Sequence, residues 1–130
     1  MDENQASNGP IILIVEDDAF MGSLLERKFQ QKNFQISRAL NVDEARKIIE
    51  AGPITLILLD IILPGTDGLT FLKELKLNPQ FKSIPVIITS NLGKEEEIEK
   101  GLAEGASDYV VKAHTTPGEI VEKVEKILAA

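Results

Sequence analysis

Short apolar segments alternate with longer segments of helical periodicity along the chain. Five apolar runs have the length of β-strands: IILIV (11–15), FQISR (34–38), ITLILL (54–59), IPVIIT (84–89) and DYVV (108–111). The first, third and fourth runs are almost continuously apolar, which is typical of strands buried on both faces of a parallel sheet. The pattern therefore predicts five strands, three of them in the interior.

Between the strands, apolar residues recur every three or four positions, as on the buried face of an amphipathic helix. Four stripes are clear: Met21, Leu24, Leu25 and Phe29; Val42, Ala45, Ile48 and Ile49; Leu69, Leu72 and Leu75; and Ile120, Val124, Ile127 and Leu128. A further helix, at about 94–104, has few apolar residues and contains Gly101, which costs about 1 kcal/mol relative to alanine. We expect this helix to be the most mobile.

Signals for the ends of helices agree with these segments. Two residue pairs resemble capping boxes, and a proline stands at a first helical position: Asn41 with Glu44, Thr116 with Glu119, and Pro117. Gly52-Pro53, Asn78-Pro79 and Gly105 act as breakers. The order is a strand followed by a helix, five times over, which predicts an α/β fold with helices on both faces of a parallel sheet.

Composition and charge narrow the class of protein. The 130 residues are enough for one domain with a hydrophobic core. The absence of cysteine excludes disulfides and thiolate metal sites and suits the cytoplasm. The net charge of −7 argues against direct nucleic-acid binding and against an anionic membrane surface, because both need a basic patch. It permits divalent cations and basic partner surfaces.

The first ten residues, MDENQASNGP, are acidic and polar and lack the features of a signal peptide. No uncharged run approaches the roughly 18 residues that span a bilayer. We predict a flexible N-terminal tail at 1–9 and a domain at 10–130.

Chemically active side chains stand where the predicted strands end. In chain order they are Glu16, Asp17 and Asp18; Asp60; Thr89 and Ser90; and Lys112. The carboxyl ends of parallel strands share one edge of the sheet, and ligands of such folds bind there. Clustered carboxylates repel one another, and a hard cation such as Mg²⁺ removes that repulsion.

Asp60 interrupts the apolar run ITLILLDIIL, and an unpaired buried charge costs several kcal/mol. A carboxylate can act as the nucleophile in phosphoryl transfer and form an acyl phosphate. A nearby lysine and hydroxyl suit the phosphoryl oxygens. We therefore predict that Asp60 is a phosphoacceptor.

Four motifs then resemble the receiver domains of two-component response regulators, the CheY-like family. They are the acidic pair after ILIV, LLDIILPGTDG, PVIITSNLG and GASDYVVK, and the resemblance covers residues 11–129. It implies a doubly wound (βα)5, flavodoxin-like three-layer sandwich with a five-stranded parallel sheet in the order 2-1-3-4-5. It also implies a signalling phosphoacceptor rather than an enzyme.

The resemblance assigns roles residue by residue. Glu16 and Asp17 would form the acidic metal pocket, with Asp17 the more direct ligand. Asp60 would accept the phosphoryl group and bind Mg²⁺, which the backbone carbonyl of Ile62 would also bind. Lys112 would pair with a phosphoryl oxygen. The switch residues would be Tyr109 and a hydroxyl five residues after Pro85, which is Ser90, with Thr89 as the alternative.

The implied partners are a sensor histidine kinase or a histidine phosphotransfer protein, and a downstream protein. That protein would read the surface formed by the helix at 94–104, the strand at 108–111 and the last helix. The chain would act as a monomer or as a phosphorylation-linked dimer.

The sequence departs from the family pattern at three places. Asn91 stands where a small residue is usual, Ala113 replaces the proline after the lysine, and Ala130 ends the chain. We expect a trans bond before Ala113, and Asn91 either narrows access for phosphodonors or hydrogen bonds to the phosphoryl group. The chain is either a single-domain regulator or part of a larger protein.

Simpler interpretations remain for several residues. Asp18 and Asp67 are expected to cap helices, and His114, the single histidine, receives no role. Lys112 could be a solvated lysine, Ser90 could bond only to nearby backbone, and Tyr109 could simply pack.

Other functions fit less well. A phosphatase of the haloacid dehalogenase type needs a general acid two residues after the nucleophile, where this chain has Ile62. A flavodoxin-like cofactor binder needs a phosphate loop where EDDAF stands. A docking module that works without phosphorylation leaves the acidic cluster unexplained.

The lifetime of the phosphorylated state also follows from the resemblance. In the family, the side chains two residues after the phosphoacceptor and two after the switch hydroxyl flank the path of the hydrolytic water. Here they are Ile62 and Leu92, which can neither orient nor deprotonate water. We predict slow self-dephosphorylation.

Overall fold

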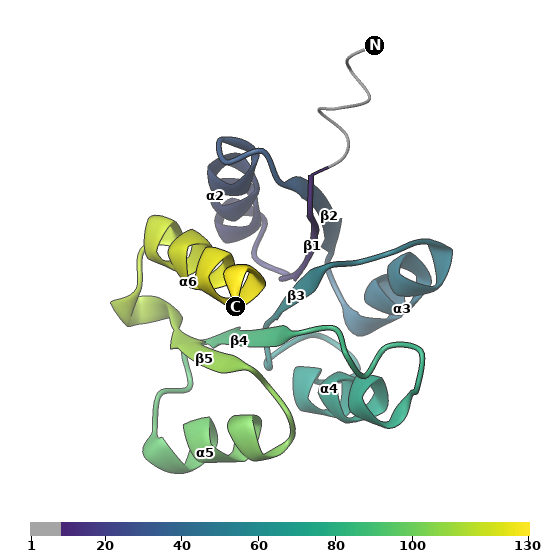
Figure 1. The fold of residues 1–130 in the computed structure, drawn as a ribbon. Helices are drawn as coiled ribbons and strands as arrows, with labels where there is room; N and C mark the ends of the chain where they lie inside the picture. Colours follow the sequence, from purple (N-terminus) through teal and green to yellow (C-terminus); the bar gives the residue numbers. More distant parts are fainter. Residues whose placement is uncertain (1–8) are drawn as a thin grey trace.

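The computed structural model describes residues 9–130, which form a five-stranded parallel sheet flanked by helices (Figure 1). The predicted tail at 1–9 lies outside the described residues except for Gly9. The strands are β1 (Ile11–Val15), β2 (Gln35–Ala39), β3 (Leu56–Leu59), β4 (Val86–Ser90) and β5 (Asp108–Val111). The helices are α2 (Ala19–Gln30), α3 (Val42–Ala51), α4 (Gly68–Leu77), α5 (Glu95–Ala103) and α6 (Pro117–Ala129), with a short 3₁₀ helix, η1 (Lys112–His114).

The strands are hydrogen-bonded in the order β2-β1-β3-β4-β5, and every pair is parallel. This confirms the predicted doubly wound, flavodoxin-like fold and its strand order. β4 runs from Val86 to Ser90, later than the predicted 84–89, so Ser90 is the last residue of the strand and lies at the edge of the sheet.

Helices cover both faces of the sheet, as Figure 1 shows. α2 and α6 pack on one face, where Leu25 and Phe29 of α2 and Ile120 and Val124 of α6 lie in one apolar cluster. α3 and α4 supply the cluster on the other face, and Ile98 of α5 packs against it. Because each central strand contributes alternate residues to both clusters, its apolar run is nearly continuous.

Side chains cap several helices as the sequence predicts. Asp18 accepts hydrogen bonds from the backbone of Phe20 and Met21 at the start of α2, and Asp67 accepts one from Thr70 at the start of α4. Thr116 and Glu119 form a reciprocal capping box at α6, with a proline in its first turn. The pair at α3 differs, because Asn41 caps the backbone of Glu44 while the Glu44 carboxylate accepts from Leu40.

Gly101 is the one residue of α5 that is buried. It lies in the interior of the helix, where its missing side chain would otherwise contact the sheet. The expected mobility of α5 stays a prediction.

All peptide bonds in residues 9–130 are trans, including the one before Ala113. Within the same residues, no helix has both the length and the apolar character needed to cross a membrane.

Candidate functional site

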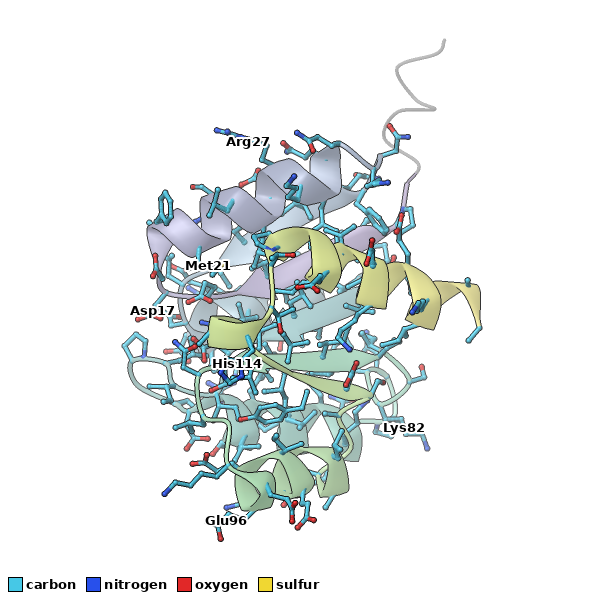
Figure 2. The ribbon with its side chains drawn as sticks, turned by 90° about the vertical axis from the view of Figure 1, so that its left-hand side faces the viewer. Asp17, Met21, Arg27, Lys82, Glu96 and His114 are labelled. Atoms are coloured by element: carbon cyan, nitrogen blue, oxygen red, sulfur yellow. The ribbon has the colours of Figure 1, made fainter. Side chains whose placement is uncertain are left out.

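The carboxyl ends of the strands place the predicted chemical groups at one edge of the molecule. Figure 2 shows Asp17 and His114 at this edge and Lys82 at the opposite one. An open pocket of about 340 Å³ lies there, lined by Glu16, Asp17, Asp18, Asp60, Ile62, Ser90, Asn91 and Lys112. Six residues named from the sequence for a site role therefore meet in one cavity, although they come from four different strand ends.

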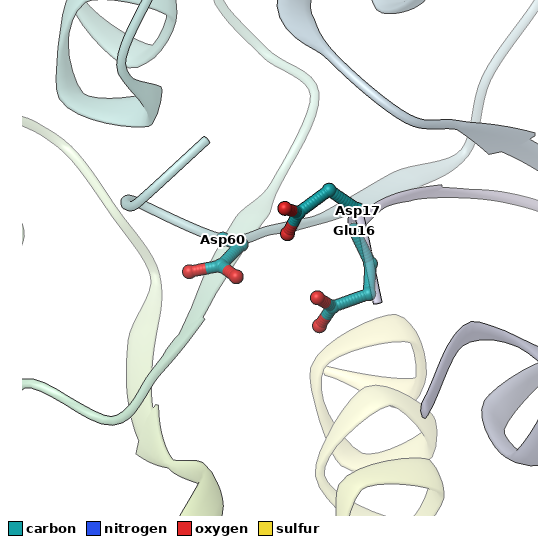
Figure 3. A group of neighbouring side chains, drawn as sticks. All are labelled: Glu16, Asp17 and Asp60. Carbon is teal, nitrogen blue, oxygen red and sulfur yellow. The ribbon is translucent and has the colours of Figure 1, made fainter. Parts of the chain in front are cut away.

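Three carboxylates converge in this pocket. Glu16, Asp17 and Asp60 each have an oxygen within 4.8 Å of the oxygens of the other two (Figure 3). Glu16 and Asp60 are buried, with 3% and 6% of their surface exposed, whereas Asp17 is exposed. Asp17 makes no hydrogen bond or ion pair with another described residue, so its carboxylate is available to a ligand.

Lys112 offsets part of this negative charge. Its Nζ donates to Glu16 Oε1 at 2.5 Å and to Asp60 Oδ2 at 2.8 Å, and 12% of its side chain is exposed. Burial by itself would lower the pKa of Lys112, but its hydrogen bonds to Asp60 and Glu16 outweigh that effect and raise it. Burial raises the pKa of Glu16 in spite of the bond to Lys112.

The backbone around Asp60 fixes the orientation of its carboxylate. Asp60 Oδ1 accepts a hydrogen bond from the Ile62 N–H at 3.1 Å, while Oδ2 faces Lys112. A side chain at Gly68, the first residue of α4, would place its Cβ 2.1 Å from the Asp60 carbonyl oxygen. Gly68 therefore lets α4 begin directly against the Asp60 backbone. Gly68 is the last glycine of LLDIILPGTDG, and only the folded structure reveals its close approach to Asp60.

A chain of hydrogen bonds links Ser90 to Tyr109. Ser90 Oγ is fully buried and accepts from the Leu92 N–H at 3.1 Å. The Tyr109 hydroxyl donates to the Leu92 carbonyl at 2.5 Å. Burial raises the pKa of Tyr109, opposed by a hydrogen bond with Ser90. The ring of Tyr109 lies inward, with 8% of the residue exposed.

The remaining residues named from the sequence take different positions. Ile62 lines the pocket and is 59% exposed, and Asn91 also lines it. Leu92 and Thr89 do not belong to the lining. Thr89 is buried, and it alternates with Ser90 along β4, so that of the two hydroxyls only Ser90 reaches the pocket.

The three carboxylates fit a hard divalent cation. Magnesium prefers a small number of carboxylate oxygens together with water, and the cluster offers two buried carboxylates beside an exposed one. The oxygens of Glu16 are engaged by Lys112 and by the Asp18 N–H, so Asp17 is the least encumbered donor.

A larger cavity, of about 430 Å³, lies at the opposite edge of the sheet, and apolar side chains of Ile49, Pro53, Ile54, Phe81 and Ile84 form much of its wall. Glu50 is the one carboxylate residue in its lining. The chemistry of the side chains, rather than the size of the cavity, identifies the smaller pocket as the site.

Comparison with known proteins identifies the family of this chain. The family described as "Response regulator receiver domain" matches residues 12–125. The transcriptional regulatory protein BaeR of Escherichia coli is 38% identical over 123 residues, which are 93% of this chain and 49% of that protein. The chain thus spans about half the length of this curated relative.

Solved structures share the fold across almost the whole chain. A putative response regulator from Chloroflexus aurantiacus has a TM-score of 0.88 and 30% identity, covering 95% of this chain and all of that one. The Mn²⁺-bound form of response regulator Rcp1 has a TM-score of 0.80 and 25% identity, covering 92% of this chain and 94% of that one.

Proposed function

The chain belongs to the response regulator receiver family of two-component phosphorelays, whose members are signalling phosphoacceptors rather than enzymes, and we propose that Asp60 is its phosphoacceptor. The observation that carries this proposal is the position of the Asp60 carboxylate. It lies at the bottom of the pocket between Lys112 Nζ and the Ile62 N–H, beside two further carboxylates. An acid held in this way has a positive group ready for the phosphoryl oxygens.

The proposed reaction moves a phosphoryl group from a phosphohistidine to Asp60. The P–N bond of the donor breaks as an Asp60 carboxylate oxygen forms a P–O bond, and the imidazole nitrogen keeps the electron pair. Lys112 Nζ would exchange its contact with Asp60 for one with a phosphoryl oxygen. The proposed physiological donor is a sensor histidine kinase or a histidine phosphotransfer protein.

Glu16, Asp17, Asp60 and the Ile62 carbonyl would hold Mg²⁺. The bound cation would supply positive charge for the phosphoryl oxygens and remove the repulsion among the carboxylates. The three carboxylates already lie within reach of one another.

The proposed switch runs from Ser90 to the outer surface. When the Ser90 hydroxyl turns to a phosphoryl oxygen, the Leu92 N–H loses its acceptor, and the hydrogen-bond chain to Tyr109 has to rearrange. Phosphorylation would then shift a population between two states of the surface formed by α5, β5 and α6. A downstream protein, or a second copy of the chain, would read that surface.

We further propose that residues 10–130 form the receiver unit and that it works in the cytoplasm as a monomer or a phosphorylation-linked dimer. The curated relative is a transcriptional regulator by name and about twice as long. The acidic charge of this chain supports signalling through protein contacts rather than direct binding of nucleic acid.

Intact mass after incubation with Mg²⁺ and a small acyl-phosphate donor tests the phosphoacceptor. We expect a gain of one phosphoryl group that is absent without Mg²⁺ and absent in Asp60→Asn. The matched control is Asp67→Asn, which changes a helix cap outside the pocket and should label normally. Labelling that persists in Asp60→Asn would contradict the proposal.

The phosphorylated state is proposed to be long-lived because the Ile62 side chain brings apolar bulk to the mouth of the pocket. The double variant Ile62→Asn with Leu92→Glu should lose its phosphoryl group faster than the parent, as measured by intact mass over time. Leu40→Asn, an exposed apolar residue outside the pocket lining, is the control. Equal rates of loss in the double variant and the parent would contradict slow hydrolysis through these residues.

A further inference from the structure

Gly101 lies at the closest approach between α5 and the sheet. A Cβ added there would stand 2.6 Å from Ile88 Cδ1 and 3.0 Å from Tyr109 Cδ2. Ile88 and Tyr109 are direct neighbours across β4 and β5, so α5 presses its one buried residue onto this pair. A methyl group at this position would have to displace one of the two side chains or the helix.

The inward position of Tyr109 depends on the same space. The ring lies between β5 and α5, and the hydroxyl at its far end donates to the Leu92 carbonyl. The Leu92 N–H in turn donates to Ser90 Oγ. The packing that keeps the ring under α5 therefore also positions the Leu92 backbone and, through it, the Ser90 hydroxyl.

We propose that Gly101 is a positioning residue: its missing side chain admits Tyr109 to the inward position and so sets the geometry of Leu92 and Ser90. This extends the proposed function, because it assigns control of the switch to a residue outside the pocket. Glycine weakens an isolated helix, but in this fold Gly101 leaves the space in which the Tyr109 ring packs.

Quenching of tyrosine fluorescence by acrylamide tests the proposal directly. Tyr109 is the single tyrosine and the chain has no tryptophan, so all of the emission reports on this side chain. In the parent protein the quenching constant should be low, because Tyr109 is buried. In Gly101→Ala it should rise measurably above the parent value, because the added methyl group crowds Tyr109 Cδ2 at 3.0 Å and shifts the ring from its inward position. An unchanged constant in a folded Gly101→Ala protein would overturn the proposal.

The control is Gly118→Ala in the first turn of α6. A Cβ there would meet only Thr116 Oγ1, at 3.9 Å, so the variant should leave the quenching of Tyr109 unchanged. A rise as large as that in Gly101→Ala would mean that any such helical substitution exposes the ring, and the proposal would fail.

A second variant distinguishes a local clash with the Tyr109 ring from a general destabilisation of α5. Ile88→Val removes Cδ1, the atom nearest to the added methyl group. The double variant Gly101→Ala with Ile88→Val should be quenched less than Gly101→Ala alone, because the methyl group gains the space that Ile88 Cδ1 occupies in the parent. If α5 is merely loosened, loss of a core methylene will increase the quenching further, and that result would overturn the proposal.

The two proposals fail in different ways. Quenching is measured without Mg²⁺ or phosphodonor, so it tests the role of Gly101 even if Asp60 never accepts a phosphoryl group. With Mg²⁺ and acyl phosphate, the parent should show a change in Tyr109 quenching that Gly101→Ala lacks. Absence of mass gain in the parent would count against Asp60, and an identical response in both proteins would count against Gly101.

Discussion

Two partly buried lysines lie at opposite edges of the sheet and have different hydrogen-bond acceptors. One is paired with carboxylates and the other with backbone carbonyls. Lys112 follows β5 and pairs with two buried carboxylates. Lys76 lies near the end of α4, where its Nζ donates to the carbonyls of Lys82 at 3.1 Å and Ile84 at 2.9 Å, in the segment that leads into β4. The pKa of Lys112 is raised and that of Lys76 is lowered by its burial.

The difference lies in the charge of the acceptors. Backbone carbonyls satisfy the hydrogen bonds of Lys76 but carry only partial charges, so its desolvation is not offset. The carboxylates around Lys112 carry full charges and more than offset it. A buried lysine is therefore no sign of function by itself. Lys76 donates to carbonyls of the segment between α4 and β4, whereas Lys112 pairs with carboxylates of a cluster that fits a divalent cation.

The largest effect is expected from a glycine at the site. Gly68→Ala should lower the free energy of unfolding by about 3 kcal/mol or more, because its Cβ would collide with the Asp60 backbone rather than with a movable side chain. Gly52 at the opposite edge has nothing within 4 Å and precedes a proline in extended conformation. Urea unfolding of Gly52→Ala should show no loss. Equal losses would remove the contrast between the two edges.

Lys112→Met should destabilise the protein next most strongly. Removal of one partner from a buried ion pair costs roughly 3–5 kcal/mol, and we expect about the lower limit because the pocket is open to water. Mg²⁺ should restore more stability to this variant than to the parent in urea unfolding. Lys123→Met, which breaks an exposed pair with Asp108, is the control and should cost under about 1 kcal/mol. If Mg²⁺ stabilised Lys112→Met no more than it stabilises the parent, the loss of stability would not come from unpaired carboxylate charge.

Lys76→Met should cost about 1–2 kcal/mol, since two carbonyls lose their donor while the aliphatic stem is kept. That stem lies against Gly105, whose added Cβ would stand 2.9 Å from Lys76 Cγ. Mg²⁺ should stabilise this variant by the same increment as the parent. A larger increment, measured by urea unfolding, would connect Lys76 to the distant site.

Asp17→Asn should raise stability without Mg²⁺ by on the order of 1 kcal/mol, because it removes one of three neighbouring charges. Asp18→Asn is the matched control, because asparagine caps helices as well as aspartate does and Asp18 lies outside the cluster. The gain should vanish at saturating Mg²⁺, which stabilises the parent more. A variant less stable than the parent without Mg²⁺ would show that the carboxylates do not repel one another.

The alternation of elements predicted the parallel sheet, and the resemblance to receiver domains supplied the strand order. The meeting of the site residues was predictable because the carboxyl ends of parallel strands share one edge of the sheet. It predicted Asp18 and Asp67 as caps because capping is local. The roles of Gly68, Gly101 and Lys76 were not visible, because each depends on a close approach between segments distant in the chain. A helical propensity scale penalises Gly101, while the fold uses the space that it leaves.

The smallest expected effect is the dependence of stability on alkaline pH. The two lysines should differ in how their contributions to the free energy of unfolding change as the pH rises. The folded pKa of Lys76 is lowered, so between that value and the unfolded value of about 10.4 the unfolded chain binds more protons, and the stability contributed by Lys76 rises with pH. The folded pKa of Lys112 is raised, so its contribution is constant up to about pH 10.4 and falls only above it. In urea unfolding from neutral pH to about 10, the stability difference between the parent and Lys76→Met should grow, while that between the parent and Lys112→Met should stay level. If both differences changed in the same direction, carbonyls and carboxylates would be equivalent partners for a buried lysine, and the distinction between the two edges would be lost.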